Sequence, residues 1–238
     1  MLEWPSRTLT QRTRWAAVLE ALASGVARPP DAFEEMIGAY RYPVYAWFRQ
    51  RGHTVEEAND LTRRLPGVLA GSGVSAEGAA EGERFRTAVL RALGGWDTRA
   101  GSGHREWAAS PGALLPLDAV VVEEKWQSHP WLHPLSAGEQ FRHAWAATVV
   151  GRAVGRLRRE WVADGSDEVC DALLPVVLGT SDRGVEASAI AGRLGFSERA
   201  LERAIAGLRR HLAVAVRHEI ADTVRSEALV DDELGCLS

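Results

Sequence analysis

Arginines near the C-terminus have the type and spacing of residues that bind phosphate groups. They lie in a predicted helix whose apolar residues, Leu201, Ile205, Leu208 and Leu212, recur at intervals of four, three and four. Residues at these intervals share one helix face, so the apolar side chains are expected to be buried and the arginines to project elsewhere. A guanidinium group donates several hydrogen bonds to phosphate oxygens. The candidate DNA-binding residues are Ser197, Arg199, Glu202, Arg203, Arg209 and Arg210.

A second amphipathic helix precedes this one, and a very tight turn joins the two. Its apolar face is formed by Ala187, Ile190, Ala191 and Leu194. Gly195 can adopt the left-handed conformation that ends a helix, Phe196 is expected to return to the core, and Ser197 caps the next helix. The pattern is typical of a helix-turn-helix, whose second helix enters the major groove of DNA. An ordinary helical hairpin inside an all-helical bundle is the alternative.

The predicted recognition helix has few residues that read bases. Its expected exposed positions include Glu202, Ala204, Ala206 and Gly207. A glutamate can accept a hydrogen bond from cytosine but repels phosphate, and alanine and glycine add at most an apolar contact. The arginines suit phosphate contacts, which position a protein without specifying sequence. This composition favours DNA affinity over specific base recognition.

The charge is unevenly distributed along the chain. In all, 28 basic and 32 acidic residues give a net charge of −4 over 238 residues, so no general basic field points to nucleic acid. Residues 183–220 carry seven arginines and four glutamates, whereas residues 221–238 carry one arginine and five acids. A basic module followed by an acidic tail is compatible with DNA binding, and the tail could equally be a solvated terminus.

Other chemistry has little support in the sequence. His129 and His133 are four residues apart, but Pro130 and Pro134 disfavour a helix there and no third metal ligand stands nearby. We find no phosphate-binding glycine loop, nucleophile elbow or paired carboxylates, so we expect neither an enzyme nor a cofactor. Two cysteines, no signal peptide and no apolar run long enough for a membrane span predict a cytoplasmic protein that is not bound to a membrane.

The elements that must position these residues are helices, because apolar residues recur at helical spacing and strand signals are nearly absent. The expected helices span 10–27, 31–51, 54–69, 82–95, 136–163 and 166–178, before the two helices above. Thr54 and Glu57 form a predicted capping box. The fold class is all-α, with a first domain at 8–98, a proline-rich linker at 99–135, a second domain at 136–224 and an acidic tail at 225–238.

Several separated motifs resemble those of one family. They are Thr13-Arg14-Trp15 with Val18-Leu19; Tyr40-Arg41-Tyr42-Pro43-Val44-Tyr45-Ala46; Arg51-Gly52-His53; Glu56-Glu57-Ala58-Asn59-Asp60-Leu61-Thr62; Arg84-Phe85-Arg86-Thr87; Phe141-Arg142-His143-Ala144-Trp145; and, in the tail, His218 to Val224 and Val230 to Leu234. In order and spacing, over nearly the full length, the chain resembles the extracytoplasmic-function (ECF) RNA polymerase sigma factors of planctomycete type.

The resemblance implies a function and partners. In that family the first domain binds core RNA polymerase and recognises and melts the −10 promoter element, and the second reads the −35 element. It implies polymerase-binding candidates at Tyr42, Asp60, Thr62, Arg63 and Arg64. Promoter-melting candidates are Arg84, Arg86, Trp96, Arg99, Arg105 and Trp107. The implied partners are core polymerase, promoter DNA and a regulatory protein such as an anti-sigma factor.

Two segments depart from the family pattern. After Thr62 the family continues with acidic and aromatic residues on one helix, whereas here the run is Arg63-Arg64-Leu65-Pro66, and a proline inside a helix costs about 3 kcal/mol. The melting segment is shortened to residues 94–99 and is rich in glycine nearby. These departures leave a second hypothesis open, a sigma-like scaffold or adaptor that acts through protein contacts without melting promoters.

The predicted linker is too apolar to remain solvated. It contains Leu114-Leu115-Pro116-Leu117, Val120-Val121-Val122, Trp126, Trp131 and Leu132. Disordered linkers are polar and poor in such residues. We therefore expect residues 99–135 to pack against one or both domains in the free protein and to hold them in a compact arrangement.

Overall fold

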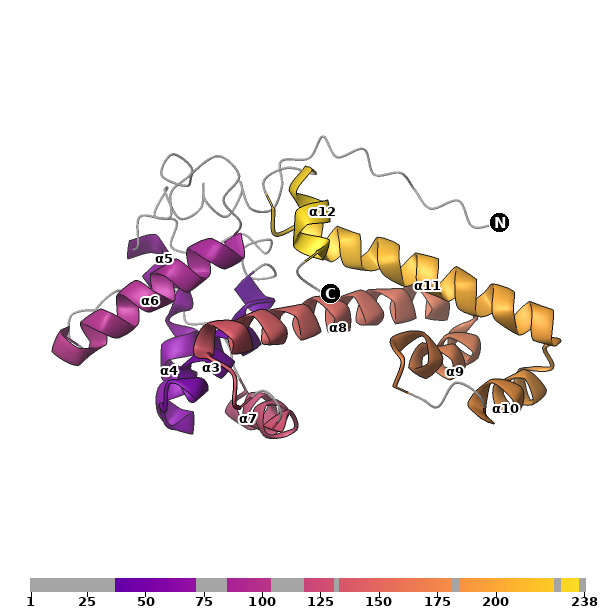
Figure 1. Ribbon diagram of the computed structural model, residues 1–238, viewed down its shortest axis with the longest axis horizontal. Coiled ribbons are helices and arrows are strands. Elements are labelled where there is room, and N and C mark those ends of the chain that lie inside the picture. The colour runs from indigo at the N-terminus through magenta and orange to yellow at the C-terminus, as the bar shows by residue number, and fades with distance from the viewer. Residues whose placement is uncertain are drawn as a thin grey trace. The chain divides into compact units, whose positions relative to one another are not determined.

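The computed structural model describes residues 37–71, 85–103, 118–130, 133–180, 185–224 and 228–235. These residues form helices and contain no strand, which confirms the all-α class (Figure 1). The expected helix at 10–27 and the Asp31 cap lie outside the described residues. The helices are α3 Arg41–Gln50, α4 Val55–Arg63, α5 Leu65–Gly71, α6 Phe85–Gly103, α7 Ala119–Gln127, α8 Ala137–Ala163, α9 Asp167–Leu178, α10 Val185–Leu194, α11 Glu198–Ala221 and α12 Ala228–Leu234.

The chain divides into two compact units. The first consists of residues 1–148 and 220–238, and the second of residues 149–219. The boundaries fall inside α8 and α11, and the helix within the predicted linker, α7, belongs to the first unit. The domain boundaries at 8–98 and 136–224 stay predictions.

Aromatic side chains form much of the core of the first unit. The ring of Tyr40 meets Phe85 edge to face at 4.8 Å, and Phe48 meets Trp96 in the same way at 5.3 Å. Such edge-to-face pairs add to the free energy gained by burying the rings. These contacts join the segment around α3 to α6, which are separated in sequence by α4 and α5.

The ends of α4 follow from local sequence. Thr54 Oγ1 accepts a hydrogen bond from the backbone N–H of Glu57, and the Glu57 carboxylate accepts one from the N–H of Thr54, which confirms the predicted capping box. α4 ends at Arg63, and Pro66 is the second residue of α5. The first turn of a helix tolerates proline because its N–H groups have no partner within the helix. Pro66 therefore sits at the start of a separate helix.

The second unit has an aliphatic core. Leu157 from α8, Leu173 from α9, Ile190 from α10 and Leu208 from α11 are buried together. Gly179 ends α9 in the left-handed conformation, with φ of 70°. Glycine is favoured there because it has no Cβ to clash with the backbone. α8 to α11 thus converge on one cluster of buried side chains.

The predicted linker is helical in part and packs against the first unit. α7 contacts α3 and α4 and lies beside them in Figure 1. Val122 and Trp126 are buried, which confirms packing for this part of the linker. Val120 and Val121, expected to pack as well, are 65% and 58% exposed, because they lie on the outer side of the helix. Residues 104–117, Trp131 and Leu132 lie outside the described structure.

No helix in the described part of the chain is long and apolar enough to cross a membrane.

Candidate functional site

The turn between α10 and α11 has the conformation that its sequence predicts. Gly195 has φ of 64°, the left-handed conformation expected of it, and the N–H of Phe196 donates to the Ala191 carbonyl at 2.9 Å. The Phe196 side chain packs against the core of the second unit. The N–H of Ala200 donates to Ser197 Oγ at 3.3 Å, so Ser197 caps α11 as predicted. This turn fixes the direction in which α11 leaves the core.

The two faces of α11 differ sharply in character. Leu201 and Leu208 are buried, and Ile205 and Leu212 pack against the same cluster, which confirms the predicted apolar stripe. Ala204 is partly buried against the same cluster, so the expectation that it is exposed is wrong. Ala204 precedes Ile205 and borders the apolar stripe. The remaining candidates on this helix stay accessible.

The arginines lie on the face of α11 opposite the core. At about 100° per residue, Arg199, Arg203 and Arg210 align on one side of the helix, roughly half a turn away from Leu201 and Leu208. All three are exposed, as are Arg209 and Glu202 beside them. The helix therefore presents a row of guanidinium groups to solvent, over about three turns. This row, with the Ser197 cap, is the candidate nucleic-acid interface.

Glu219 does not offset the charge of this row. Its carboxylate accepts hydrogen bonds from Arg152 Nε at 2.9 Å and from Arg156 Nε and Nη2 at 3.0 and 2.7 Å. Burial alone would raise the pKa of Glu219, but the two α8 arginines outweigh it and hold this pKa below its usual value. The negative charge of Glu219 is therefore compensated by the two arginines of α8. These contacts also anchor the end of α11 in the second unit.

The polymerase-binding candidates of α3 and α4 are partly buried. Thr62 is fully buried, and its hydroxyl donates to the Ala58 carbonyl at 2.7 Å. Tyr42 is also buried. Arg63 is half-buried, and Arg64 forms a two-bond ion pair with exposed Asp60, at 2.9 and 3.2 Å. Only part of this predicted surface is thus open to a partner: the Asp60–Arg64 pair and the accessible fraction of Arg63.

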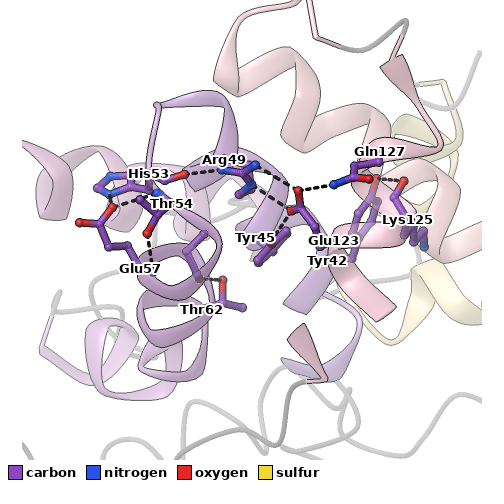
Figure 2. A network of polar contacts seen from close by, with 11 residues as sticks. Tyr42, Tyr45, Arg49, His53, Thr54, Glu57, Thr62, Glu123, Lys125 and Gln127 are labelled. Atoms are coloured by element: carbon purple, nitrogen blue, oxygen red, sulfur yellow. Dashed lines mark hydrogen bonds and ion pairs between the residues drawn. The ribbon is translucent and has the colours of Figure 1, made fainter. Parts of the chain in front are cut away.

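A network of polar contacts joins α7 to α3 (Figure 2). Its centre is the Glu123 carboxylate, which accepts from the Tyr45 hydroxyl at 2.5 Å and from Arg49 Nε and Nη2 at 3.0 and 3.1 Å. Gln127, one turn along α7, donates to the same carboxylate at 3.0 Å. The remaining Arg49 nitrogen, Nη1, donates to the His53 carbonyl at 2.6 Å. Each of the three Arg49 side-chain nitrogens therefore donates to a carboxylate or a carbonyl.

A second contact lies beside the network. Lys125 Nζ is 4.2 Å from the centre of the Tyr42 ring, and the Tyr42 hydroxyl donates to the Lys125 carbonyl at 3.4 Å. A cation over an aromatic face is stabilised by the negative potential of the ring. The Tyr42 ring therefore contacts both the side chain and the backbone of one residue of α7.

The pKa values of these groups reflect burial and pairing. Burial raises the pKa of Tyr42 to about 12 and lowers the pKa of Lys125. Burial would also raise the pKa of Glu123, but its hydrogen bonds from Arg49, Tyr45 and Gln127 outweigh this effect and lower it. Two causes raise the pKa of Tyr45: burial is the larger, and the hydrogen bond to the negatively charged Glu123 is the next. Glu123 is thus ionised and Tyr45 protonated near neutral pH.

Two of the promoter-melting candidates are in the core. Arg86 is buried, paired with Glu233 through Nη2 at 2.7 Å, and lies over the Trp145 ring at 4.9 Å. Trp96 is buried against Phe48. Both side chains have structural partners and neither is open to DNA. Arg84, Arg105 and Trp107 lie outside the described residues; Arg99 lies in α6, but its side chain is not described.

The acidic tail is not a solvated run throughout. Within α12, Asp231 and Asp232 are exposed, whereas Val230 is buried and the Glu233 side chain is only 1% exposed. The expectation of a solvated tail is therefore wrong for Glu233. The reason is Arg86, whose buried charge requires a carboxylate partner.

The two histidines of the predicted linker have other partners. His129 Nδ1 lies 2.7 Å from the Lys125 carbonyl, and the His133 ring stacks on Trp126 at 4.5 Å. Among the described residues, no group of three or more histidine, cysteine, aspartate or glutamate side chains could hold a metal ion.

Comparison with known proteins gives no match: no family model, curated protein or solved structure resembles this chain significantly.

The sequence motifs predict neither the Glu123 network nor the Arg86–Glu233 pair. A signal for the first is present, since Glu123 directly follows the buried Val122 and precedes the buried Trp126 by three residues. A carboxylate in such surroundings needs a partner. The second pair joins residues 147 positions apart, and no local pattern relates them.

Proposed function

We propose that this protein is a sigma-type transcription-initiation factor of the ECF kind, which acts in the cytoplasm with core RNA polymerase and promoter DNA. The observation that carries the proposal is the arginine row of α11, opposite the buried face and directly after the Gly195 turn. This arrangement is typical of a helix-turn-helix and supports the proposal that α11 is a recognition helix supported by α10. The order of motifs along the chain adds to this support.

The row suits phosphates better than bases. Arginine can donate two hydrogen bonds to one phosphate, whereas the exposed Ala206 between Arg203 and Arg210 offers only a methyl group. We infer that the second unit binds duplex DNA with modest sequence preference, and that a regulatory protein such as an anti-sigma factor acts on the same factor.

A sigma-like adaptor is the second candidate, and particular observations favour it. Arg86 and Trp96, which would act in promoter melting, are buried in the first unit. Pro66 starts a separate helix where the family pattern continues one. Such an adaptor would bind polymerase through α3 and α4 without opening DNA.

Binding to polymerase tests both candidates together. The purified protein is expected to co-elute with core RNA polymerase at low salt, and a sigma factor should then start transcription from a cognate promoter. Promoter opening is measured by the reactivity of unpaired thymines with permanganate. Co-elution without such reactivity would favour the adaptor. Absence of co-elution at low salt would contradict both.

Replacing Arg203 and Arg210 together by alanine should weaken duplex binding about 100-fold at low salt. Each charge-assisted hydrogen bond contributes about 1.5 kcal/mol, which is about tenfold in affinity. The slope of log K against log salt should fall by about 2, since each phosphate contact contributes about 0.9. Fluorescence anisotropy with a labelled duplex over a salt series measures both quantities.

Arg158→Ala is the matched control for this pair. Arg158 is an exposed arginine of the same unit, but it is on α8 and pairs with Asp171 at 2.9 Å. Its loss should change duplex affinity less than twofold. Equal losses at Arg158 and at the α11 positions would mean that only net charge matters, and the α11 row would not be the interface.

A further inference from the structure

Helix α7 depends on its contacts with α3 and α4 for its structure. It has nine residues, from Ala119 to Gln127, and isolated helices shorter than about 12 residues are marginal in water. Asp118 caps its first turn by accepting from the N–H groups of Val120 and Val121. A single cap does not hold such a helix, so its order comes from docking. A helix of this kind can be released without unfolding the unit beneath it.

The docked helix buries Val122 and Trp126, and its polar contacts centre on charged groups. The Glu123 carboxylate accepts hydrogen bonds from Arg49 and Tyr45, and the Lys125 ammonium lies over the Tyr42 ring. The chain after α7 is held by Gln50, whose side chain donates to the carbonyls of His133 at 2.9 Å and Leu135 at 2.5 Å. Charge-assisted hydrogen bonds are the stronger ones in proteins, so Glu123 is the principal polar contact of the docked helix.

The docked helix covers a residue that the proposed function assigns to a partner. Tyr42 is one of the polymerase-binding candidates, and its ring and hydroxyl both contact Lys125. α7 also contacts α4, the helix of the candidates Asp60, Thr62 and Arg63. With α7 removed, this surface would offer the Arg49 guanidinium, the Tyr45 hydroxyl and the Tyr42 ring. These groups fit a helix that brings one carboxylate and one cation or apolar side chain.

We propose that α7 is an intramolecular occupant of the surface where α3 and α4 bind core RNA polymerase, and that polymerase binds by displacing it. The inference rests on the proposed function. The displacing segment is a helix of polymerase that presents a carboxylate to Arg49 and Tyr45 in the place of Glu123. The free protein is thus held in a state of reduced polymerase affinity, because only the fraction with α7 released can bind.

Glu123→Gln tests the occupancy directly. The amide keeps the shape of the side chain but loses the charge that holds Arg49. Hydrogen exchange of the α7 amides, residues 119–127, should become about tenfold faster, and affinity for core polymerase should rise by up to the same factor. Glu124→Gln is the control, because Glu124 is the exposed neighbour of the same type, and it should change neither quantity.

A second, milder variant distinguishes the release of α7 from misfolding of the first unit. Tyr45→Phe keeps the buried ring and removes only the hydroxyl that donates to Glu123. It should act in the same direction by a smaller factor. Unchanged exchange in α6, which lies in the same unit as α7, would show that each variant remains folded. Unchanged exchange of α7 in a folded Glu123→Gln protein would overturn the proposal.

The complex with polymerase separates this inference from the function on which it rests. In the complex of the unmodified protein, exchange of the α7 amides should be faster than in the free protein, while exchange in α3 should be slower. If polymerase binds and α7 stays as protected as before, α7 does not cover the binding surface and only this inference fails. If polymerase does not bind any variant, the proposed function fails, and this inference fails with it.

Discussion

Replacing Glu233 by alanine should lower the free energy of unfolding of the first unit by about 3–5 kcal/mol. The substitution leaves the Arg86 guanidinium buried without its carboxylate, since Arg86 and Glu233 are 7% and 1% exposed and 2.7 Å apart. A buried charge that loses its partner pays its desolvation cost without compensation. Urea unfolding followed by tryptophan fluorescence measures the loss, because Trp47, Trp96 and Trp145 are all buried in this unit.

The control and the rescue make this prediction specific. Glu124→Ala removes an exposed acid from the same unit, on α7, and should change stability by less than about 0.5 kcal/mol. Arg86→Met together with Glu233→Leu replaces both charges by apolar groups and should recover most of the loss. A Glu233→Ala protein as stable as the unmodified one would mean that α12 does not dock on α6 in solution.

Leu208→Ala should destabilise the second unit by about 2–5 kcal/mol. Leu208 is fully buried on α11, in the cluster that also holds Leu157, Leu173 and Leu201. Truncating it removes apolar contacts and leaves a cavity that the surrounding helices fill only in part. Hydrogen exchange resolved to individual helices should show the loss of protection in α9 to α11, and duplex binding should fall because the arginine row loses its support.

A second α11 substitution separates packing from charge. Val214→Ala changes a residue that is 36% exposed on the same helix and should alter stability by less than about 0.5 kcal/mol. It should leave duplex affinity unchanged. If Leu208→Ala kept full stability, the apolar stripe of α11 would not be packed in the core. The arginines on the opposite face would then not be held in a row directed to solvent.

The burial of Arg86 also bears on promoter melting. Melting requires side chains that stack on unpaired bases or hold single-stranded phosphates. Arg86 instead pairs with Glu233 and lies over Trp145, and Trp96 packs on Phe48. Any melting by this protein must therefore use other residues, or a state in which these contacts open. Promoter-opening assays on the Glu233 variants would distinguish the two.

Local sequence was sufficient for α3, α8 and α9 and for the α10–α11 turn, whereas α7 and α12 were not predicted as helices and α4 and α5 were predicted as one. The Thr54–Glu57 cap, the left-handed Gly195 and the stripe from Leu201 to Leu212 all involve residues within a few positions of one another. Their conformations follow from nearby hydrogen bonds and from which side chains share a helix face. For the same reason the arginine row of α11 could be predicted without a structure.

Long-range pairs could be found only in the tertiary structure. Glu123 meets Arg49 across 74 positions, and Arg86 meets Glu233 across 147. Periodicity shows that a residue faces the core, but it does not show which distant residue it meets there. The sequence by itself therefore determined an all-helical chain with an arginine-bearing helix near its end. The tertiary structure decided which charged residues are buried as partners and which remain exposed to bind, because a buried charge is stable only beside an opposite one.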